Sequence, residues 1–169
     1  MSKIVIRGRI EDVWREITKT DEPQRAIFNA KMHTLGLAPG AAIQMRTPDN
    51  KYTSVVGEIL AIDPPTHLSH TMKFTPYDDP YCKVTYDLEE IDGGVEFTLT
   101  SEDIAAGTKT AKDMVRGGDF IVKTLNEIVE DGRPALGTRI LYVLFGLLGP
   151  LMTPKKSQAS NWPLEGKAS

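Results

Sequence analysis

The chain has 169 residues, of which 40% are hydrophobic and 25% charged, a composition typical of one globular domain and not of a disordered chain. The formal net charge of −3 provides no basic field for a phosphate backbone, which argues against nucleic-acid binding. The single cysteine, Cys82, has no partner for an internal disulfide. The first residues contain no apolar leader, so we expect a cytoplasmic protein.

The first forty residues predict one strand, two short helices and a loop. Residues 3–7 alternate as a strand does, and the following apolar residues have helical spacing. Because Pro23 is tolerated in a first helical turn, residues 21–29 predict a second short helix. Residues 31–40 predict a loop that ends in the helix- and strand-breaking sequence Ala-Pro-Gly. The apolar stripe of the first helix consists of Ile10, Val13, Trp14 and Ile17.

A series of strands with short connections follows. We predict strands over residues 42–47, 54–62, 67–74, 81–91 and 94–101. The last two are joined at Asp92 and Gly93, a dipeptide typical of tight hairpins. Regular spacing and short turns favour an antiparallel meander.

The best-patterned element is a long helix over residues 111–129. Thr110 and Asp113 have the spacing of a capping box, and Gly132 and Pro134 supply stop signals. A sheet with one apolar face needs a cover, and this helix is the element large enough to provide it. We therefore predict an α+β fold, with a curved antiparallel sheet of about six strands around the helix. The stripe is formed by Ala111, Met114, Val115, Gly118, Ile121, Val122, Leu125, Ile128 and Val129.

Residues 140–152 are almost wholly apolar. The run has 13 residues and contains Gly146, Gly149 and Pro150, whereas a transmembrane helix needs roughly 20 residues. We therefore expect no transmembrane segment. Packing on the domain itself or in a homodimer is the favoured interpretation, and a position on a membrane surface is the alternative. The predicted organisation is a domain over residues 1–132, an apolar extension over 133–153 and a loose polar tail over 154–169.

Two segments resemble a known superfamily. The sequence GRIEDVW at residues 8–14 is similar to the first strand and helix start of the SRPBCC, START-like or Bet v 1-like proteins. GEILAIDPP at residues 57–65, followed by LSHT at 68–71, is similar to their central hairpin. The most similar branch is the one named after the activator of the heat-shock-protein-90 ATPase, and the resemblance covers residues 3–132. That branch usually has Gly-Trp within the last helix, whereas GGDF stands here at residues 117–120.

The resemblance implies a helix-grip fold with a hydrophobic tunnel between sheet and long helix. Strand alternation supports such an inner face, because side chains two residues apart share one side of a strand. The alternative is a solid core without a cavity. The residues that we expect to line the pocket are Met45, His70, Met72, Phe74, Tyr86, Phe97, Met114, Gly118 and Ile121.

Three of these residues carry the functional hypotheses. His70 and Tyr86 place polar groups on an apolar face, where they either orient a ligand or transfer protons, or else satisfy each other or the backbone. Gly118 marks either a close approach of helix to sheet or room for a ligand. His33, His67 and His70 lack metal-ligand spacing, so we expect no metal and no cofactor.

The favoured function is binding of a small apolar or amphipathic molecule, because no catalytic set is complete. One alternative is a cyclase- or hydrolase-type enzyme that uses His70 and Tyr86 as acid and base. The other, implied by the resemblance, is a co-chaperone-like module that acts on a heat-shock ATPase.

Overall fold

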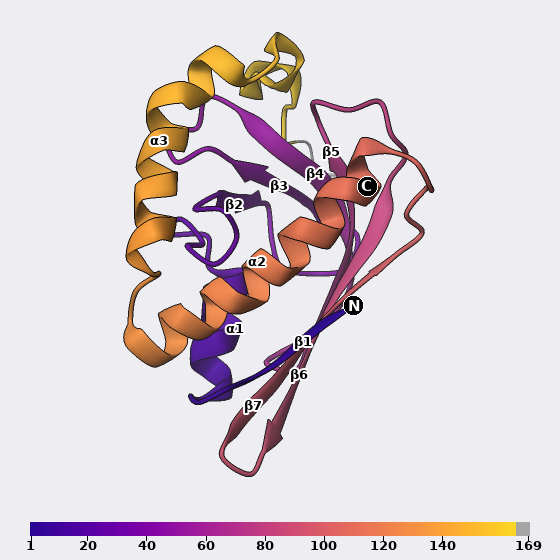
Figure 1. Cartoon of the computed structure of the whole chain (residues 1–169). Helices are drawn as coiled ribbons and strands as arrows, with labels where there is room; N and C mark the ends of the chain where they lie inside the picture. Colours follow the sequence, from indigo (N-terminus) through magenta and orange to yellow (C-terminus); the bar gives the residue numbers. More distant parts are fainter. Residues whose placement is uncertain (165–169) are drawn as a thin grey trace.

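The computed structural model describes residues 1–164, in which one open sheet is covered on one face by two helices (Figure 1). The sheet has seven strands in the order β1-β7-β6-β5-β4-β3-β2, and every neighbouring pair is antiparallel. The fold is therefore the predicted α+β helix-grip arrangement. The strands are β1 (Ser2–Ile6), β2 (Lys31–Thr34), β3 (Ala42–Arg46), β4 (Thr53–Asp63), β5 (His67–Phe74), β6 (Cys82–Ile91) and β7 (Gly94–Glu102).

The sheet has one strand more than the sequence predicts. Residues 31–34, expected as a loop, form β2 and pair with β3 at one edge of the sheet. Met32 lies opposite Met45 in this pair, and both side chains are buried. A strand of four residues with one apolar side chain on the inner face shows no recognisable alternation. It could therefore be found only from its pairing with β3.

The predicted second helix at residues 21–29 is wrong. After α1 (Ile10–Thr18) the chain makes a turn closed by a bridge between Gln24 and Ala30. The buried ammonium of Lys19 lies 2.7 Å from Glu16 and 3.0 Å from Glu22, and it holds the start of this segment against α1. Phe28 also takes a positive φ that a helix cannot contain.

The long helix α2 (Lys109–Asp131) begins and ends with clear caps. Thr108, and not the predicted Thr110, accepts a hydrogen bond from the backbone N–H of Ala111. Asp113 instead accepts a hydrogen bond from the Tyr77 hydroxyl. Gly132 ends the helix with a φ of 74°, a left-handed conformation that glycine adopts without strain.

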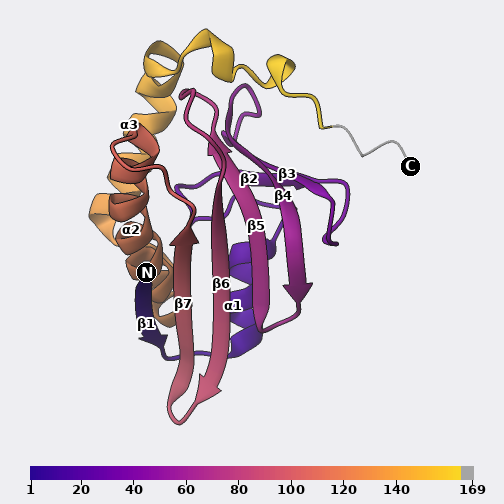
Figure 2. The ribbon, with the colours of Figure 1, turned by 90° about the vertical axis from the view of Figure 1, so that its right-hand side faces the viewer.

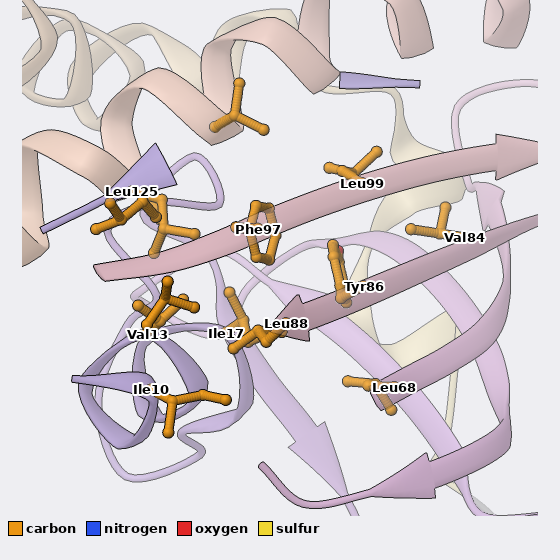
Figure 3. Packing of buried hydrophobic residues seen from close by; sticks show 14 of the residues in the cluster. Ile10, Val13, Ile17, Leu68, Val84, Tyr86, Leu88, Phe97, Leu99 and Leu125 are labelled. Carbon is orange, nitrogen blue, oxygen red and sulfur yellow. The ribbon is translucent and has the colours of Figure 1, made fainter. Parts of the chain in front are cut away.

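The core lies between the inner face of the sheet and the two helices. Figure 3 shows side chains of α1, α2 and the strands meeting there, with Leu125 of α2 at the left and Phe97 of β7 near the centre. Both of these side chains are fully buried. Ala30, Met32 and Met45 form a second, smaller cluster towards the β2 edge of the sheet.

The apolar segment forms a third helix, α3 (Leu136–Met152), and none of its residues is buried. The chain then continues in two 3₁₀ helices, Lys155–Ser157 and Ala159–Asn161. This first part of the predicted loose tail is held to the sheet, because Gln158 forms a bridge with Tyr52 (Figure 2). Residues 165–169 of the predicted tail lie outside the described part of the chain.

Within residues 1–164, no single helix is both long and apolar enough to cross a bilayer. Only α2 and α3 taken together meet the criteria of length and composition, and they are separated by a bend of 117°.

Candidate ligand site on the inner face of the sheet

Strand register brings the two polar candidates together. His70 pairs with Val84 across β5 and β6, and Leu68 pairs with Tyr86 two residues away. Directly paired residues share one face of a sheet, as do residues two apart. His70 and Tyr86 therefore lie on the inner face, and their ring centroids are 5.8 Å apart.

His70 is buried, with 6% of its surface exposed, and its ring is tied to the backbone. Its Nδ1 atom lies 2.9 Å from the carbonyl oxygen of Thr71. Burial lowers the pKa of His70 below its ordinary value, which favours the neutral ring. Because a carbonyl only accepts hydrogen bonds, Nδ1 carries the proton and Nε2 is left as an acceptor. Among residues 1–164, no group donates a hydrogen bond to Nε2.

Tyr86 contributes a hydroxyl group to the same face. Its ring stacks on Phe97 at a centroid distance of 5.9 Å, and Figure 3 shows both side chains directed into the core. Burial raises the pKa of the Tyr86 hydroxyl, which keeps it protonated and able to donate. In the described chain this hydroxyl has no hydrogen-bond partner. The inner face thus presents one acceptor and one donor on largely buried side chains, and neither has a partner in the described chain.

The other predicted pocket residues are spread along the sheet. Met72 and Phe97 are buried in the main core, while Phe74, Met114 and Ile121 are partly buried against it. Met45 belongs to the second cluster. β3, which carries Met45, is two strand spacings from β5, roughly 10 Å along the sheet. We take the residues around His70 and Tyr86 as the centre of the candidate site, and the place of Met45 in it stays a prediction.

Gly118 lies where α2 crosses β1 and β7, and it approaches Leu99, the direct partner of Tyr86 in the sheet. A methyl group added at Gly118 would lie 3.1 Å from the Ser2 hydroxyl oxygen, a tight contact. The hydroxyl of Ser2 donates to Asp119 on the same helix. This geometry favours the close approach of helix to sheet as the reason for the glycine. Its neighbour Gly117 faces Phe28, which stacks on Phe120 at 4.6 Å.

Two hollows in the surface lie away from this site. One, of about 340 Å³, is on the outer face of the sheet, where His67 lies 2.7 Å from Asp87. The other, of about 450 Å³, lies beside the start of α2, where Asp79 accepts a hydrogen bond from the backbone N–H of Thr110. Neither hollow lies between α2 and the sheet. Both depend on residues from separate turns and strands, and strand alternation alone does not reveal them.

The residues that the structure describes contain no group of three or more His, Cys, Asp or Glu side chains placed to hold a metal ion. Cys82, the one cysteine, is buried.

Comparison with known families supplies the identity of the fold. The family model described as activator of Hsp90 ATPase homolog 1-like protein matches residues 7–130, which is well over half of the chain. The chain belongs to this family. The Hsp90-activator-like assignment also agrees with the resemblance seen at residues 8–14 and 57–71. No curated protein sequence matches the chain significantly.

Solved structures show the same fold for this Hsp90-activator-like chain at low sequence identity. Protein MLL2253 from Mesorhizobium loti is 18% identical over 77% of this chain and 95% of its own, with a TM-score of 0.64. CalU16 from Micromonospora echinospora is 16% identical over 90% and 86%, with a TM-score of 0.59. PFC0360w, an HSP90 activator from Plasmodium falciparum, is 19% identical over 79% and 96%, with a TM-score of 0.57. These likenesses agree with the family match, which supports the SRPBCC or Bet v 1-like fold.

Proposed function

We propose that the chain binds a small apolar or amphipathic molecule against the inner face of β5 and β6. The observation that carries the proposal is a pair of polar atoms on largely buried side chains with apolar neighbours, His70 Nε2 and the Tyr86 hydroxyl, which have no hydrogen-bond partner in the described chain. A few polar groups in an apolar setting are typical of small-molecule sites. Family membership supports the same class of function.

The chemistry of the two groups favours a ligand with an uncharged polar end. A hydroxyl on the ligand can donate to His70 Nε2, and a hydroxyl or carbonyl oxygen can accept from Tyr86. Both side chains are neutral at pH 7 because burial shifts their pKa values away from the charged forms. A carboxylate would lose its hydration there without gaining a cation. The apolar body of the ligand would then lie against Leu68, Met72 and Phe97.

Neither of the two hollows opens beneath α2, and we propose that side chains move when the ligand enters the site. Met72 and Met114 are suited to this, since unbranched methionine side chains adapt readily to a new neighbour. The ligand would thus enlarge a space that the free protein fills.

Binding is tested with 1-dodecanol as the probe and Tyr86→Phe as the variant. The substitution removes one hydroxyl and keeps the ring that stacks on Phe97, so affinity for the alcohol should fall up to about tenfold. Tyr81→Phe is the matched control, because Tyr81 is 51% exposed. This variant should bind the alcohol as the wild type does. Calorimetry gives the affinities, and native mass spectrometry of the purified protein reports any molecule that copurifies. Equal affinities in all three proteins would contradict the proposal.

The proximity of His70 and Tyr86 also favours the enzymatic alternative. Acid and base groups must both come within about 3 Å of the reacting atoms. A cyclase or hydrolase would require turnover that both His70→Gln and Tyr86→Phe abolish. Ligand binding that persists without any turnover would leave the binding function alone.

The family description and the Plasmodium activator favour a third possibility, action on a heat-shock ATPase. This function predicts that the full chain retains the Hsp90 chaperone in a pull-down and raises its ATPase rate. Lack of retention at micromolar concentration would exclude it.

A further inference from the structure

The helix α3 exposes apolar side chains around most of its circumference. The exposed fraction is 63% for Val143, 69% for Leu147 and 84% for Leu151. Only Thr138, Leu141, Tyr142 and Gly149 are partly buried. Tyr142 contacts the domain, because its hydroxyl donates to the carbonyl oxygen of Arg25 and its ring packs edge-on against Phe120. One helix from a second copy would cover one stripe of α3 and leave the rest in water.

The charges around α3 differ in sign from those of the domain that carries it. Residues 1–131 contain 15 Lys and Arg against 22 Asp and Glu, whereas residues 132–164 contain four basic residues and no acidic one. Arg133 and Arg139 lie at the start of α3, and Lys155 and Lys156 follow its end. Lys156 pairs with Asp78, and in the described chain the other three have no ion-pair partner. Basic groups therefore flank the apolar helix at both ends.

Both ends of α3 are also tied to the same domain. Before the helix, the backbone N–H of Ala135 donates to the carboxylate of Glu127 on α2. After it, Thr75 donates a hydrogen bond to the buried hydroxyl of Ser157, and the Ala159 N–H donates to Lys51. Figure 2 shows α3 running from the end of α2 to the segment beside β4 and β5. A helix of 17 residues, about 25 Å long, whose ends are both fixed to one domain lies along a surface and does not cross it.

We propose that α3 docks the protein on the surface of an anionic phospholipid bilayer. Its apolar side chains would enter the boundary between headgroups and acyl chains, and Arg133, Arg139 and Lys155 would contact the acidic headgroups. Lipid is the occupant that covers all exposed sides of the helix at once and complements its positive charge. The inference is independent of the ligand proposed for His70 and Tyr86.

Vesicle flotation with the full chain tests this docking. The protein should float with vesicles of phosphatidylcholine that contain about 30 mol% phosphatidylglycerol and bind much less to pure phosphatidylcholine. Raising the salt from about 0.1 M to about 0.5 M should weaken binding. Neutralising the three unpaired basic residues as Arg133→Gln, Arg139→Gln and Lys155→Gln should lower the partition coefficient on the order of 100-fold.

The apolar contribution is tested by Leu147→Glu combined with Leu151→Glu, which should abolish flotation. The matched control is Val115→Glu combined with Leu35→Glu, two residues outside α3 that are 70% and 65% exposed and add the same charge. The control should keep most of the binding. All four positions are exposed, so unchanged thermal unfolding will show that each variant is folded.

Three results would overturn the proposal. The first is that the wild type does not float with anionic vesicles, and the second is that the α3 variant and its control lose binding equally. The third is that light scattering finds a wild-type dimer, that the α3 variant is monomeric and that vesicles bind neither protein, which would make a second copy the occupant.

Discussion

The two C-terminal helices follow one another in the chain, yet they relate to the domain in opposite ways. α2 is amphipathic, and most of its apolar stripe, including Val122 and Leu125, packs against the core, although Val115 is exposed. α3 is more apolar than α2 and buries none of its residues. Hydrophobicity alone therefore does not decide which helix enters the core. Periodicity decides it, because an apolar stripe at 3.6-residue spacing can be covered by one face of a sheet. A helix that is apolar all round needs apolar surroundings on every side.

The largest difference should come from truncating one leucine in each helix. Leu125→Ala should lower the free energy of unfolding by about 2–5 kcal/mol, because it leaves a cavity at a fully buried position in the core. Leu147→Ala should change it by less than about 0.5 kcal/mol, since Leu147 is 69% exposed. Urea unfolding followed by circular dichroism measures both. A loss above about 1 kcal/mol for Leu147→Ala would mean that α3 packs on the domain after all.

Replacing a glycine by alanine at the end of α2 and within α3 should change the stability of the protein in opposite directions. Gly132→Ala places a side chain at a φ of 74° and should cost about 1–2 kcal/mol. Gly146→Ala meets no neighbouring atom within 4 Å and should stabilise the protein by up to about 1 kcal/mol through helix propensity. The thermal unfolding midpoints of the two variants and the wild type show which variant is the more stable. Destabilisation by Gly146→Ala would show that the helix needs its glycine for a contact.

The stability of the folded protein should depend on pH through His70, which is buried as the neutral ring on the inner face of the sheet. As the pH falls below about 6.5, the unfolded chain takes up a proton at His70 that the folded chain resists, so stability decreases. The decrease stops once the pH is below the lowered folded-state pKa. Urea unfolding at about pH 7.5 and about pH 5.5 measures the change, and carboxylates titrate below this interval.

His70→Gln should reduce this pH-dependent loss of stability. Part of the loss should remain, because burial also lowers the pKa of His33. A loss in His70→Gln equal to that of the wild type would assign the whole effect to His33.

Most of the fold was predictable because its signals are local. The strand at residues 67–74 and the hairpin at Asp92 and Gly93 lie where alternation and turn chemistry put them. The main errors lie at residues 21–34. The structure of this segment is decided by the buried ion pair of Lys19 and Glu16 that precedes it and by the pairing of β2 with β3, and both depend on contacts that sequence spacing does not encode.

For the site, alternation correctly assigns His70 and Tyr86 to one face, because that property depends only on strand parity. Parity does not give distance along the sheet. It therefore grouped Met45, on β3, with His70, which lies two strands away on β5. Whether His70, Tyr86 and their neighbours bind a ligand remains a prediction for the experiments above.

The seven-stranded sheet is open, and an open sheet has two edges where a second chain can add a strand. Here β1 has five residues and lies against α2 through Ser2, while β2 at the other edge has four. Short or covered edges of this kind are poor templates for strand addition. Self-association and aggregation of this protein should therefore begin at α3 and not at the sheet, and a mild detergent, more than a change in pH, should keep concentrated solutions clear.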